Sequence, residues 1–417
     1  MKKFITSLFC AALLPLAALE ISVAQNKYRC KKGEKVTFLI QLDKGRENGD
    51  FQVLLQGGSY LAYVQKMSAD ANGRAHLTLN ADRAGFLSVR VDDAGKSAAA
   101  AVAVDELKIL PARERPDTFD RRWNRVRKAL DISPVQYEIK EIVSQRENFR
   151  AFEVIVAMPE KDSPQLYAVM TMPSNAPAGR LAAHIFYGDR NVDSASAAYK
   201  ENTLALSVDL QPLARGGRKV EVLPQVGKNF LKDLKKIDDL AGNIVPDIFK
   251  RAARAVQFVK TLPEWDNRTV IVSGIGLGGA QAIAAAALDE DVTLCVALSP
   301  AFGNHGGFDK GSESGWPRFH TAAGYQRDPE RALKLLDDID SCFFAQNIRR
   351  AEVIVYCGFL DDDCAPSSVY AIYNMVSSTE KQLYASFNGG HLPPAEVTEK
   401  IDHQIKAHID RKQAAFR

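Results

Sequence analysis

The sequence has few histidines and cysteines, and it has no strong excess of charge of either sign. It contains seven His and six Cys among 417 residues, and its formal net charge is +3 at pH 7. Because it has no long basic run, nucleic acid is a weak candidate partner. No stretch after the N-terminal segment approaches about 18 unbroken apolar residues, so the later sequence predicts no membrane span. The hydrophobic fraction of 46% is ordinary for a globular protein that buries a large core.

The N-terminal segment has the pattern of a signal peptide. Lys2 and Lys3 precede the apolar run FITSLFCAALLPLAAL, which is too short and too interrupted by proline for a confident membrane span. Ser22 and Ala24 are small residues at the −3 and −1 positions of a cleavage site. We therefore predict a signal peptide over residues 1–24 and an exported protein, periplasmic or extracellular after cleavage near Ala24.

The cysteine count gives no disulfide framework. Cys10 lies in the predicted signal peptide, which leaves an odd number of cysteines, and Cys357 and Cys364 are the nearest pair in sequence. An exported protein is permitted a disulfide there. A core of this size needs no covalent staple, so buried free thiols are the favoured interpretation.

The chain divides into two regions of different pattern. Residues 25–110 hold short β-prone runs separated by the turn sequences RENGD, DANGR and DDAGK, which is typical of a small β-sandwich. The junction LPARERPDTFD is rich in proline and charge. From there, residues 115–417 predict first a helix capped by Asp117 or Thr118, and then apolar strands alternating with helices. That alternation indicates an α/β fold with a mostly parallel sheet.

One strand-to-helix turn has the glycines of a nucleophile elbow but no nucleophile. In the stretch TVIVSGIGLGGA, the flanking glycines Gly274, Gly278 and Gly279 leave room for the sharp turn of a G-x-S-x-G motif. Gly276 stands where that motif has its serine. A phosphate-binding glycine loop is the competing interpretation, but the Walker lysine is absent. Ser273 lies on the incoming strand and is predicted to be a buried strand serine.

Two further strand ends carry an acid and a histidine. Asp361, Asp362 and Asp363 follow the strand-like VIVYCG, and His391 lies in the loop NGGHLPP. Taken alone, the first fits a solvated acidic turn and the second an ordinary loop histidine. In the chain order elbow, acid, histidine they follow the arrangement of α/β-hydrolases. In that fold the carboxyl ends of the strands bring such residues together.

From about Arg115 to the C-terminus, the sequence resembles the acetyl-xylan esterase and cephalosporin-C deacetylase family of α/β-hydrolases. The resemblance rests on FDRRWNRVRKAL, on the stretch from RAVQFVKTL through the elbow, on GFLDDDCAPSSVYAIYN and on FNGGHL. It implies that Asp361 is the triad acid, His391 the triad histidine and Gly276 the nucleophile position. The family elbow reads Gly-x-Ser-Gln-Gly-Gly, so Gly276 and Leu277 replace its serine and glutamine. The residues that the resemblance places at the oxyanion site are Leu277, Tyr187 and Gly188.

Two functions follow from this pattern and both stay open. The first is an exported acetyl-xylan-esterase-like hydrolase whose serine-type hydrolysis is impaired or absent, because Gly276 has no side chain to attack with. The second is a non-catalytic relative that binds carbohydrate or a protein partner through the retained pocket. The candidate ligand is an acetylated carbohydrate or another small ester, a homo-oligomer is possible, and no cofactor or metal is expected. The Gly-rich segment between His305 and His320 is a candidate lid, and His408 is predicted to lie on the surface.

Overall fold

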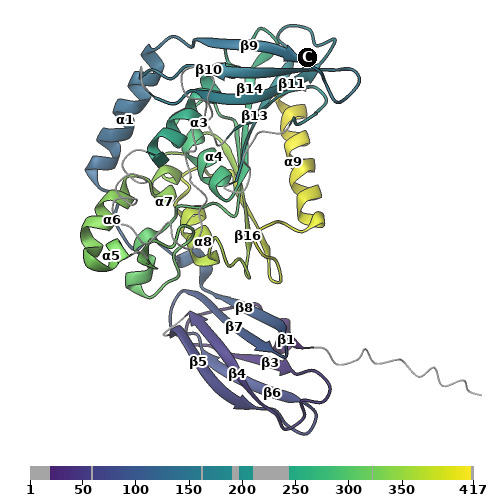
Figure 1. The fold of residues 1–417 in the computed structure, drawn as a ribbon, viewed down its shortest axis with the longest axis vertical. Helices are drawn as coiled ribbons and strands as arrows, with labels where there is room; N and C mark the ends of the chain where they lie inside the picture. Colours follow the sequence, from purple (N-terminus) through teal and green to yellow (C-terminus); the bar gives the residue numbers. More distant parts are fainter. Residues whose placement is uncertain are drawn as a thin grey trace, which may run out of the picture.

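The protein consists of an N-terminal β region and a larger α/β region stacked end to end (Figure 1). The computed structural model describes residues 19–57, 60–160, 163–189, 197–209, 244–321 and 323–414. The junction between the two regions is the short segment that precedes helix α1, Asp117–Ile132. This arrangement agrees with the small all-β region and the α/β-hydrolase fold that the sequence predicts.

The N-terminal region contains two sheets that face each other across an apolar core. Alternation of buried and exposed residues along the strands directs one side of each sheet inward, as in β3, whose even-numbered residues Val36, Phe38 and Ile40 are buried. The first sheet has the order β1-β3-β6 and the second the order β2-β8-β7-β4-β5. The strands are β1 Glu20–Val23, β2 Arg29–Cys30, β3 Lys35–Gln41, β4 Asp50–Gly57, β5 Tyr60–Ser68, β6 Arg74–Asn80, β7 Gly85–Asp93 and β8 Lys96–Val104.

The α/β region is built on a nine-stranded sheet with the order β17-β16-β15-β14-β12-β13-β11-β10-β9. Strands β12 to β17 pair in parallel, whereas β9, β10 and β11 form an antiparallel edge. The central strands are apolar on both faces because helices cover both faces. The strands are β9 Tyr137–Ile142, β10 Phe149–Val156, β11 Leu166–Pro173, β12 Leu181–Tyr187, β13 Thr203–Val208, β14 Trp265–Ile275, β15 Leu294–Leu298, β16 Glu352–Gly358 and β17 Lys381–Ser386.

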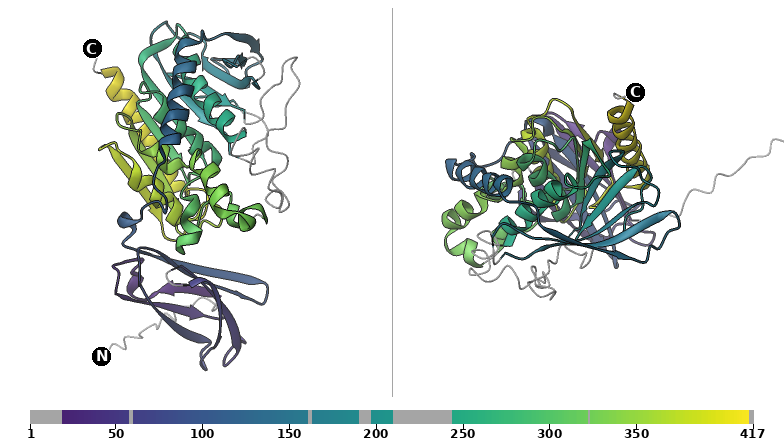
Figure 2. Two further views of the ribbon diagram at one scale, coloured as in Figure 1. Left: turned by 90° about the vertical axis from the view of Figure 1, so that its left-hand side faces the viewer. Right: turned by 90° about the horizontal axis from the view of Figure 1, so that it is seen from above.

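Helices lie on both sides of this sheet, as Figures 1 and 2 show. Helix α9 covers one face, where Val397 and Ile401 pack on β14, β15 and β16. The other face carries the main core, to which α1 contributes Phe119 and Trp123. In the described ranges, the α-helices other than α1 are α3 Val245–Val259, α4 Leu277–Leu288, α5 Ala323–Arg327, α6 Pro329–Asp337, α7 Ser341–Ala345, α8 Pro366–Met375 and α9 Ala395–Ala414.

Aromatic packing joins the β region to the α/β region. Phe86 of β7 makes an edge-to-face contact with Phe359, with ring centroids 4.9 Å apart, and packs on Tyr370 at 5.5 Å. On the other side of this contact Tyr28 stacks on Phe387 at 4.9 Å. Phe86 belongs to the main core, and Phe359 lies two residues before Asp361. The β region therefore packs directly against the start of the loop that carries Asp361.

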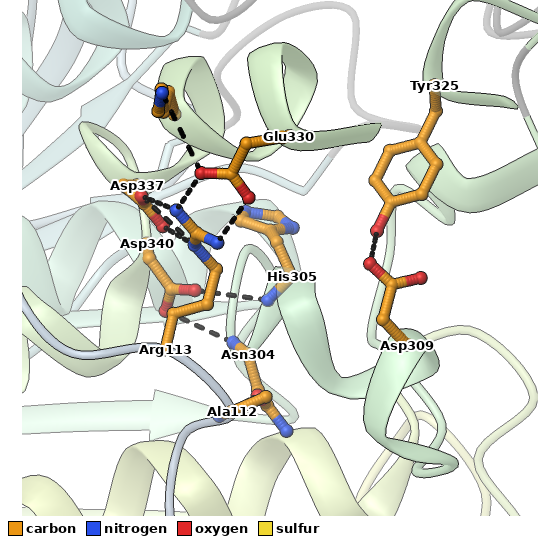
Figure 3. A network of polar contacts seen from close by, with 10 residues as sticks. Ala112, Arg113, Asn304, His305, Asp309, Tyr325, Glu330, Asp337 and Asp340 are labelled. Carbon is orange, nitrogen blue, oxygen red and sulfur yellow. Dashed lines mark hydrogen bonds and ion pairs between the residues drawn. The ribbon is translucent and has the colours of Figure 1, made fainter. Parts of the chain in front are cut away.

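An ion pair fixes the junction segment to the α/β region (Figure 3). Arg113 donates to both carboxylate oxygens of Asp337, at 2.8 Å and 2.9 Å, and to Glu330 at 3.2 Å. Beside it, the Asn304 side chain accepts from the backbone N–H of Ala112 at 2.8 Å. The fork of the guanidinium matches the carboxylate in two hydrogen bonds, so this pair fixes orientation as well as position.

Asp340 stabilises the adjoining turn in Figure 3. Its carboxylate accepts from the backbone N–H groups of Asn304 and His305 and from that of Cys342, the second residue of α7. His305 is 3% exposed and opens the short 3-10 helix His305–Lys310 at the start of the Gly-rich segment. The first part of the segment proposed as a lid is therefore a packed part of the fold.

Several details differ from the sequence-based expectations. His408 is 1% exposed and bonds Glu352 and Thr293 through its two ring nitrogens, so the prediction that it lies on the surface is wrong. Pro116, rather than Asp117 or Thr118, precedes the first turn of α1, and no side chain caps it. The five cysteines after Cys10 are all buried and unpaired, which agrees with the favoured interpretation.

The first described strand lies within the predicted signal peptide. Strand β1 pairs with β3 from Glu20 to Val23, and Ile21 and Val23 are 8% and 3% exposed. Cleavage after Ala24 removes this strand from the sandwich. Within the described ranges, no helix is long and apolar enough to cross a membrane.

Candidate active site

The glycine-rich turn lies at the carboxyl end of the central strand β14. Gly276 connects β14 to α4 with φ 56° and ψ −115°, a conformation that only glycine adopts without strain. Its N–H donates to the carbonyl of Leu298 at 2.9 Å, and its carbonyl accepts from Ala301 at 3.0 Å. These bonds hold the sharp strand-to-helix turn that the sequence predicts, with the geometry on which α/β-hydrolases place a nucleophile.

The flanking glycines allow this turn to pack closely. A Cβ on Gly274 would overlap the backbone of Gly278, and a Cβ on Gly278 would overlap the carbonyl of Tyr187. Helix α4 then continues with alanines, and all twelve of its residues are buried. The small side chains let the helix approach β14 and β15. The N-terminus of α4 is therefore fixed at the carboxyl end of β14.

The acid and the histidine meet as the chain order predicts. His391 Nδ1 lies 2.9 Å from Asp361 Oδ2, and the Asp361 side chain is 1% exposed. The other oxygen of Asp361 accepts from the backbone N–H groups of Asp363 and Cys364, at 2.8 Å and 3.0 Å. Ser299 donates to the His391 carbonyl at 2.9 Å. The carboxylate and the loop contact together orient the imidazole so that its Nε2 atom faces Gly276.

A third group, Asp189, occupies the space between the histidine and the elbow. Asp189 follows β12, and its Oδ1 accepts from the backbone N–H of Leu277 at 3.1 Å. Its Oδ2 lies 3.6 Å from His391 Nε2. A Cβ on Gly276 would lie 3.0 Å from the Cγ atom of Asp189, and it would overlap the Oδ1 atom. The carboxylate therefore fills the place in which a side chain on Gly276 would begin.

The charges around His391 favour its protonated form. Burial lowers the pKa of His391, but contacts with Asp189, Asp361 and Cys364 more than reverse that effect and raise the pKa to about 12. Two carboxylates thus hold an imidazolium between them. In this arrangement the ring has no lone pair with which to accept a proton from an attacking group at neutral pH.

The three residues expected at the oxyanion site make the following contacts in the structure. The N–H of Leu277 points into the site, but it already donates to Asp189. The hydroxyl of Tyr187 points away and donates to the carbonyl of Ala252 at 2.7 Å. The carbonyl of Gly188 accepts from the Gln281 side chain at 3.4 Å. The loop after β12 therefore reaches the elbow with the side chain of Asp189, one residue beyond the predicted pair.

Ser273 does not face His391. It is 8% exposed, and its Oγ lies 2.9 Å from His184 Nε2 in the neighbouring strand. Burial lowers the pKa of His184 to about 3, so this imidazole is neutral and the pair is a satisfied contact within the sheet. The interpretation of Ser273 as a buried strand serine agrees with this position.

Asp361, Cys364 and His391 bring one ligand atom each to within 4.8 Å of one another. The two Asp361 oxygens are already occupied by His391 and by backbone N–H groups. Burial raises the pKa of the Cys364 thiol to about 11, which keeps it protonated. A protonated thiol is a poor metal ligand, so this group fits an oriented acid–histidine pair better than a metal centre.

Comparison with known proteins decides the family of this site. Residues 98–406 match the family model described as acetyl xylan esterase (AXE1). The chain belongs to the acetyl xylan esterase family. The match covers the whole α/β region from β9 to most of α9, and it begins within β8 of the preceding β region. Gly276, Asp361 and His391 all lie inside it.

Individual relatives agree with this assignment. The chain is 28% identical over 152 residues to the acetyl esterase Axe7A of Xylanibacter ruminicola, a match that covers 36% of this chain and 34% of the relative. It therefore spans about a third of the length of that curated relative. Among solved structures, the acetyl xylan esterase of Paenibacillus sp. R4 aligns with a TM-score of 0.60 and 19% identity. That alignment covers 72% of this chain and 98% of the other.

A second solved structure, acetyl xylan esterase 1 from Thermoanaerobacterium sp., aligns with a TM-score of 0.59 and 21% identity. It covers 73% of this chain and 97% of the other. At such identities these two structures establish that this member of the acetyl xylan esterase family has the fold of the α/β-hydrolases.

No sequence motif of this acetyl xylan esterase family member singles out Asp189. The residue lies in HIFYGDR directly after Gly188. A signal was nevertheless present, because Asp189 follows the carboxyl end of a parallel strand, where ligand and catalytic groups of open α/β sheets gather. Only the register of β12 beside β14 places its carboxylate in front of Gly276.

Proposed function

We propose that this protein is an exported member of the acetyl xylan esterase family that does not hydrolyse acetyl esters by the serine route. The observation that carries the proposal is the apex of the elbow, where Gly276 has no side chain and the Asp189 carboxylate faces His391. In serine-type hydrolysis a hydroxyl attacks the acyl carbon, and the histidine takes its proton. Neither the hydroxyl nor an unprotonated imidazole is available in this arrangement.

The remaining parts of the site support a lineage from active esterases. Asp361 and His391 keep the orienting hydrogen bond of a triad, and the turn at Gly276 keeps the shape of an elbow. In the serine hydrolases tested by mutation, loss of the triad leaves roughly 10³ to 10⁴-fold catalysis over water, mostly from the oxyanion donors. Here the Leu277 N–H is occupied, so we expect even that residual activity to be reduced.

Hydrolysis of p-nitrophenyl acetate and of acetylated xylan tests the proposal on the full chain. We expect the wild type and His391→Ala to have the same low rate. His76→Ala is the matched control, because His76 lies on the exposed side of β6, far from the site in the chain. Rapid wild-type turnover that disappears in His391→Ala and persists in His76→Ala would overturn the proposal.

A second function, carbohydrate binding without hydrolysis, is favoured by a cavity between the two regions. A cavity of about 670 Å³ lies between β7 and the Gly-rich segment, and its lining includes Arg90, Arg318 and Asp361. Neither Gly276 nor His391 is part of that lining. Titration calorimetry with acetylated and deacetylated xylo-oligosaccharides tests it. Weakened binding in Arg318→Ala, with Arg121→Ala at an exposed position of α1 as the control, is the expected result.

Export is proposed on the signal-like N-terminal segment. Lys2, Lys3 and the apolar run after them support it, and the family assignment is compatible with a polysaccharide substrate outside the cell. Fractionation of cells that express the full chain, with detection of the protein in the periplasm or medium, tests this proposal. Retention of an uncleaved chain inside the cell would contradict it.

A further inference from the structure

We propose that Asp189 and Gly276 form a matched pair, in which the carboxylate of Asp189 occupies the positions that a nucleophile and an acyl oxygen would need. This inference rests on the proposed function and explains it. The site is closed by a specific side chain, and the missing hydroxyl is only part of the reason that acyl chemistry is absent.

The first step concerns space at the elbow. A Cβ on Gly276 would overlap Asp189 Oδ1 and lie 3.0 Å from both Asp189 Cγ and His391 Nε2. Contacts of this kind force one of the partners to move. A serine at position 276 and the present Asp189 conformation therefore exclude each other, and glycine is the residue that permits this conformation.

The second step concerns the oxyanion site. In an α/β-hydrolase, the backbone N–H of the residue after the nucleophile binds the oxygen of the tetrahedral intermediate. Here that N–H belongs to Leu277, and Asp189 Oδ1 accepts from it at 3.1 Å. An ester carbonyl must displace the carboxylate before it can bind. A fixed negative charge at this point also opposes the charge that develops on the acyl oxygen.

The third step concerns the histidine. Asp189 Oδ2 lies 3.6 Å from His391 Nε2, and that ring nitrogen is buried without a hydrogen-bond partner among the described residues. The ion pair between them favours the imidazolium. Asp189 thus contacts two parts of the former machinery, the oxyanion N–H and the base, and it occupies the space of the third.

A double-mutant cycle of Gly276→Ser and Asp189→Ala in the full chain tests the pairing. We expect Gly276→Ser alone to lower Tm by about 4 °C, because the new side chain displaces a bonded carboxylate in a strained turn. The double variant should have a higher Tm than Gly276→Ser, because Asp189→Ala removes the overlap. If Gly276→Ser does not fold, the double variant must fold for the proposal to stand.

Turnover of p-nitrophenyl acetate provides the second readout of the same cycle. The double variant should exceed Gly276→Ser by about 10²-fold, which is the value of one freed oxyanion donor. Equal turnover of the two variants, or equal Tm values, would overturn the proposal. These outcomes are independent of the proposed function, which fails only if the wild type itself shows turnover that His391→Ala abolishes.

Asp189→Asn serves as the control for shape. The amide keeps the volume of the carboxylate and an acceptor oxygen for Leu277, but it removes the charge. Gly276→Ser/Asp189→Asn should therefore stay closer in turnover to Gly276→Ser than to the double variant that carries Asp189→Ala. If it matches the variant that carries Asp189→Ala, occupation of space by residue 189 is not what closes the site, and the proposal is wrong.

Discussion

His391 Nε2 lies 3.6 Å from Asp189 Oδ2, on the side of the ring opposite Asp361. A triad histidine needs a free lone pair at this nitrogen in order to accept the proton of a nucleophile. In this protein the same nitrogen faces a carboxylate. The relationship places the imidazole of His391 between the carboxylates of Asp189 and Asp361.

This relationship predicts an unusual titration of His391. Burial lowers the pKa of His391, but Asp189 and Asp361 together raise it to about 12. We expect nitrogen chemical shifts to show an imidazolium at pH 8, where an ordinary histidine is neutral. Asp189→Asn should lower the pKa by about 1–3 units, because it removes one neighbouring opposite charge. A wild-type pKa near 6.5 would contradict the charge arrangement.

The same shift has a consequence for stability against pH. The folded-state pKa of His391 lies above its unfolded value, so the folded state binds the proton more tightly. This stabilisation is fully present below about pH 6.5 and declines as pH rises from there toward 12. We expect the Tm difference between the wild type and Asp189→Asn to stay constant until the pH reaches the lower pKa of His391 in the variant, and to shrink only above it, in thermal unfolding at constant salt. A Tm difference between the two proteins that grows with pH would contradict this prediction.

Because β1 is a packed edge strand, we expect residues before Gln25 to be needed for full stability of the β region. Ile21 and Val23 are buried in the sandwich core, and β1 pairs along β3. A chain that begins at Gln25 should lose about 3–5 kcal/mol of unfolding free energy in its β region relative to one that begins at Leu19, from two buried aliphatic side chains. Denaturant unfolding measures this difference.

Two measurements control that comparison. Glu20→Ala removes an exposed side chain from the same strand and should leave the unfolding free energy nearly unchanged. We also expect mass spectrometry of the exported protein to find an N-terminus upstream of Glu20. A mature chain that begins at Gln25 with full stability would show that β1 is dispensable.

We expect the loss of Arg113 at the junction to lower the free energy of unfolding by a large amount that depends on pH. The Asp337 side chain is 6% exposed, and burial raises its pKa while Arg113 opposes that rise. Arg113→Ala leaves a buried carboxylate without its cation and should cost about 3 kcal/mol at pH 7. The loss should be smaller at pH 5, because protonation of Asp337 removes the unpaired charge.

Chemical denaturation at the two pH values checks this expectation, with Arg121→Ala at an exposed position of α1 as the matched control. The control should change stability by less than about 0.5 kcal/mol at either pH. A loss in Arg113→Ala that is equal at pH 5 and pH 7 would show that packing of the side chain, and not the charge of Asp337, decides its value.

We expect Phe86 of the β region to stabilise the loop that carries Asp361. Its ring packs on Phe359 and Tyr370, and Phe359 precedes Asp361 by two residues. Phe86→Ala should cost about 3–5 kcal/mol, as truncations of buried phenylalanine do. Hydrogen exchange should increase at Asp363 and Cys364, whose N–H groups bond Asp361. Val64→Ala, at an exposed position of the same region, should change neither quantity.

The sequence was sufficient to predict the fold and the three strand ends of the site. Apolar runs of strand length, turn residues between them and glycines at Gly274, Gly278 and Gly279 each have local causes that a sequence records. The order of elbow, acid and histidine then placed Gly276, Asp361 and His391 together, because parallel strands end at one edge of a sheet. The contact between His391 and Asp361 agrees with that reasoning.

Only the tertiary structure decided what fills the elbow and that His408 is buried. Asp189 reaches Gly276 because β12 lies beside β14 in a particular register. The local sequence around Asp189 does not show which strand lies beside β12. His408 is buried because α9 packs its ring against Glu352 and Thr293 at the N-terminal ends of β16 and β15, which the periodicity of one helix does not reveal. The sequence alone determined that this esterase scaffold has no serine at its elbow. The packing of distant strands determined that a carboxylate stands there instead.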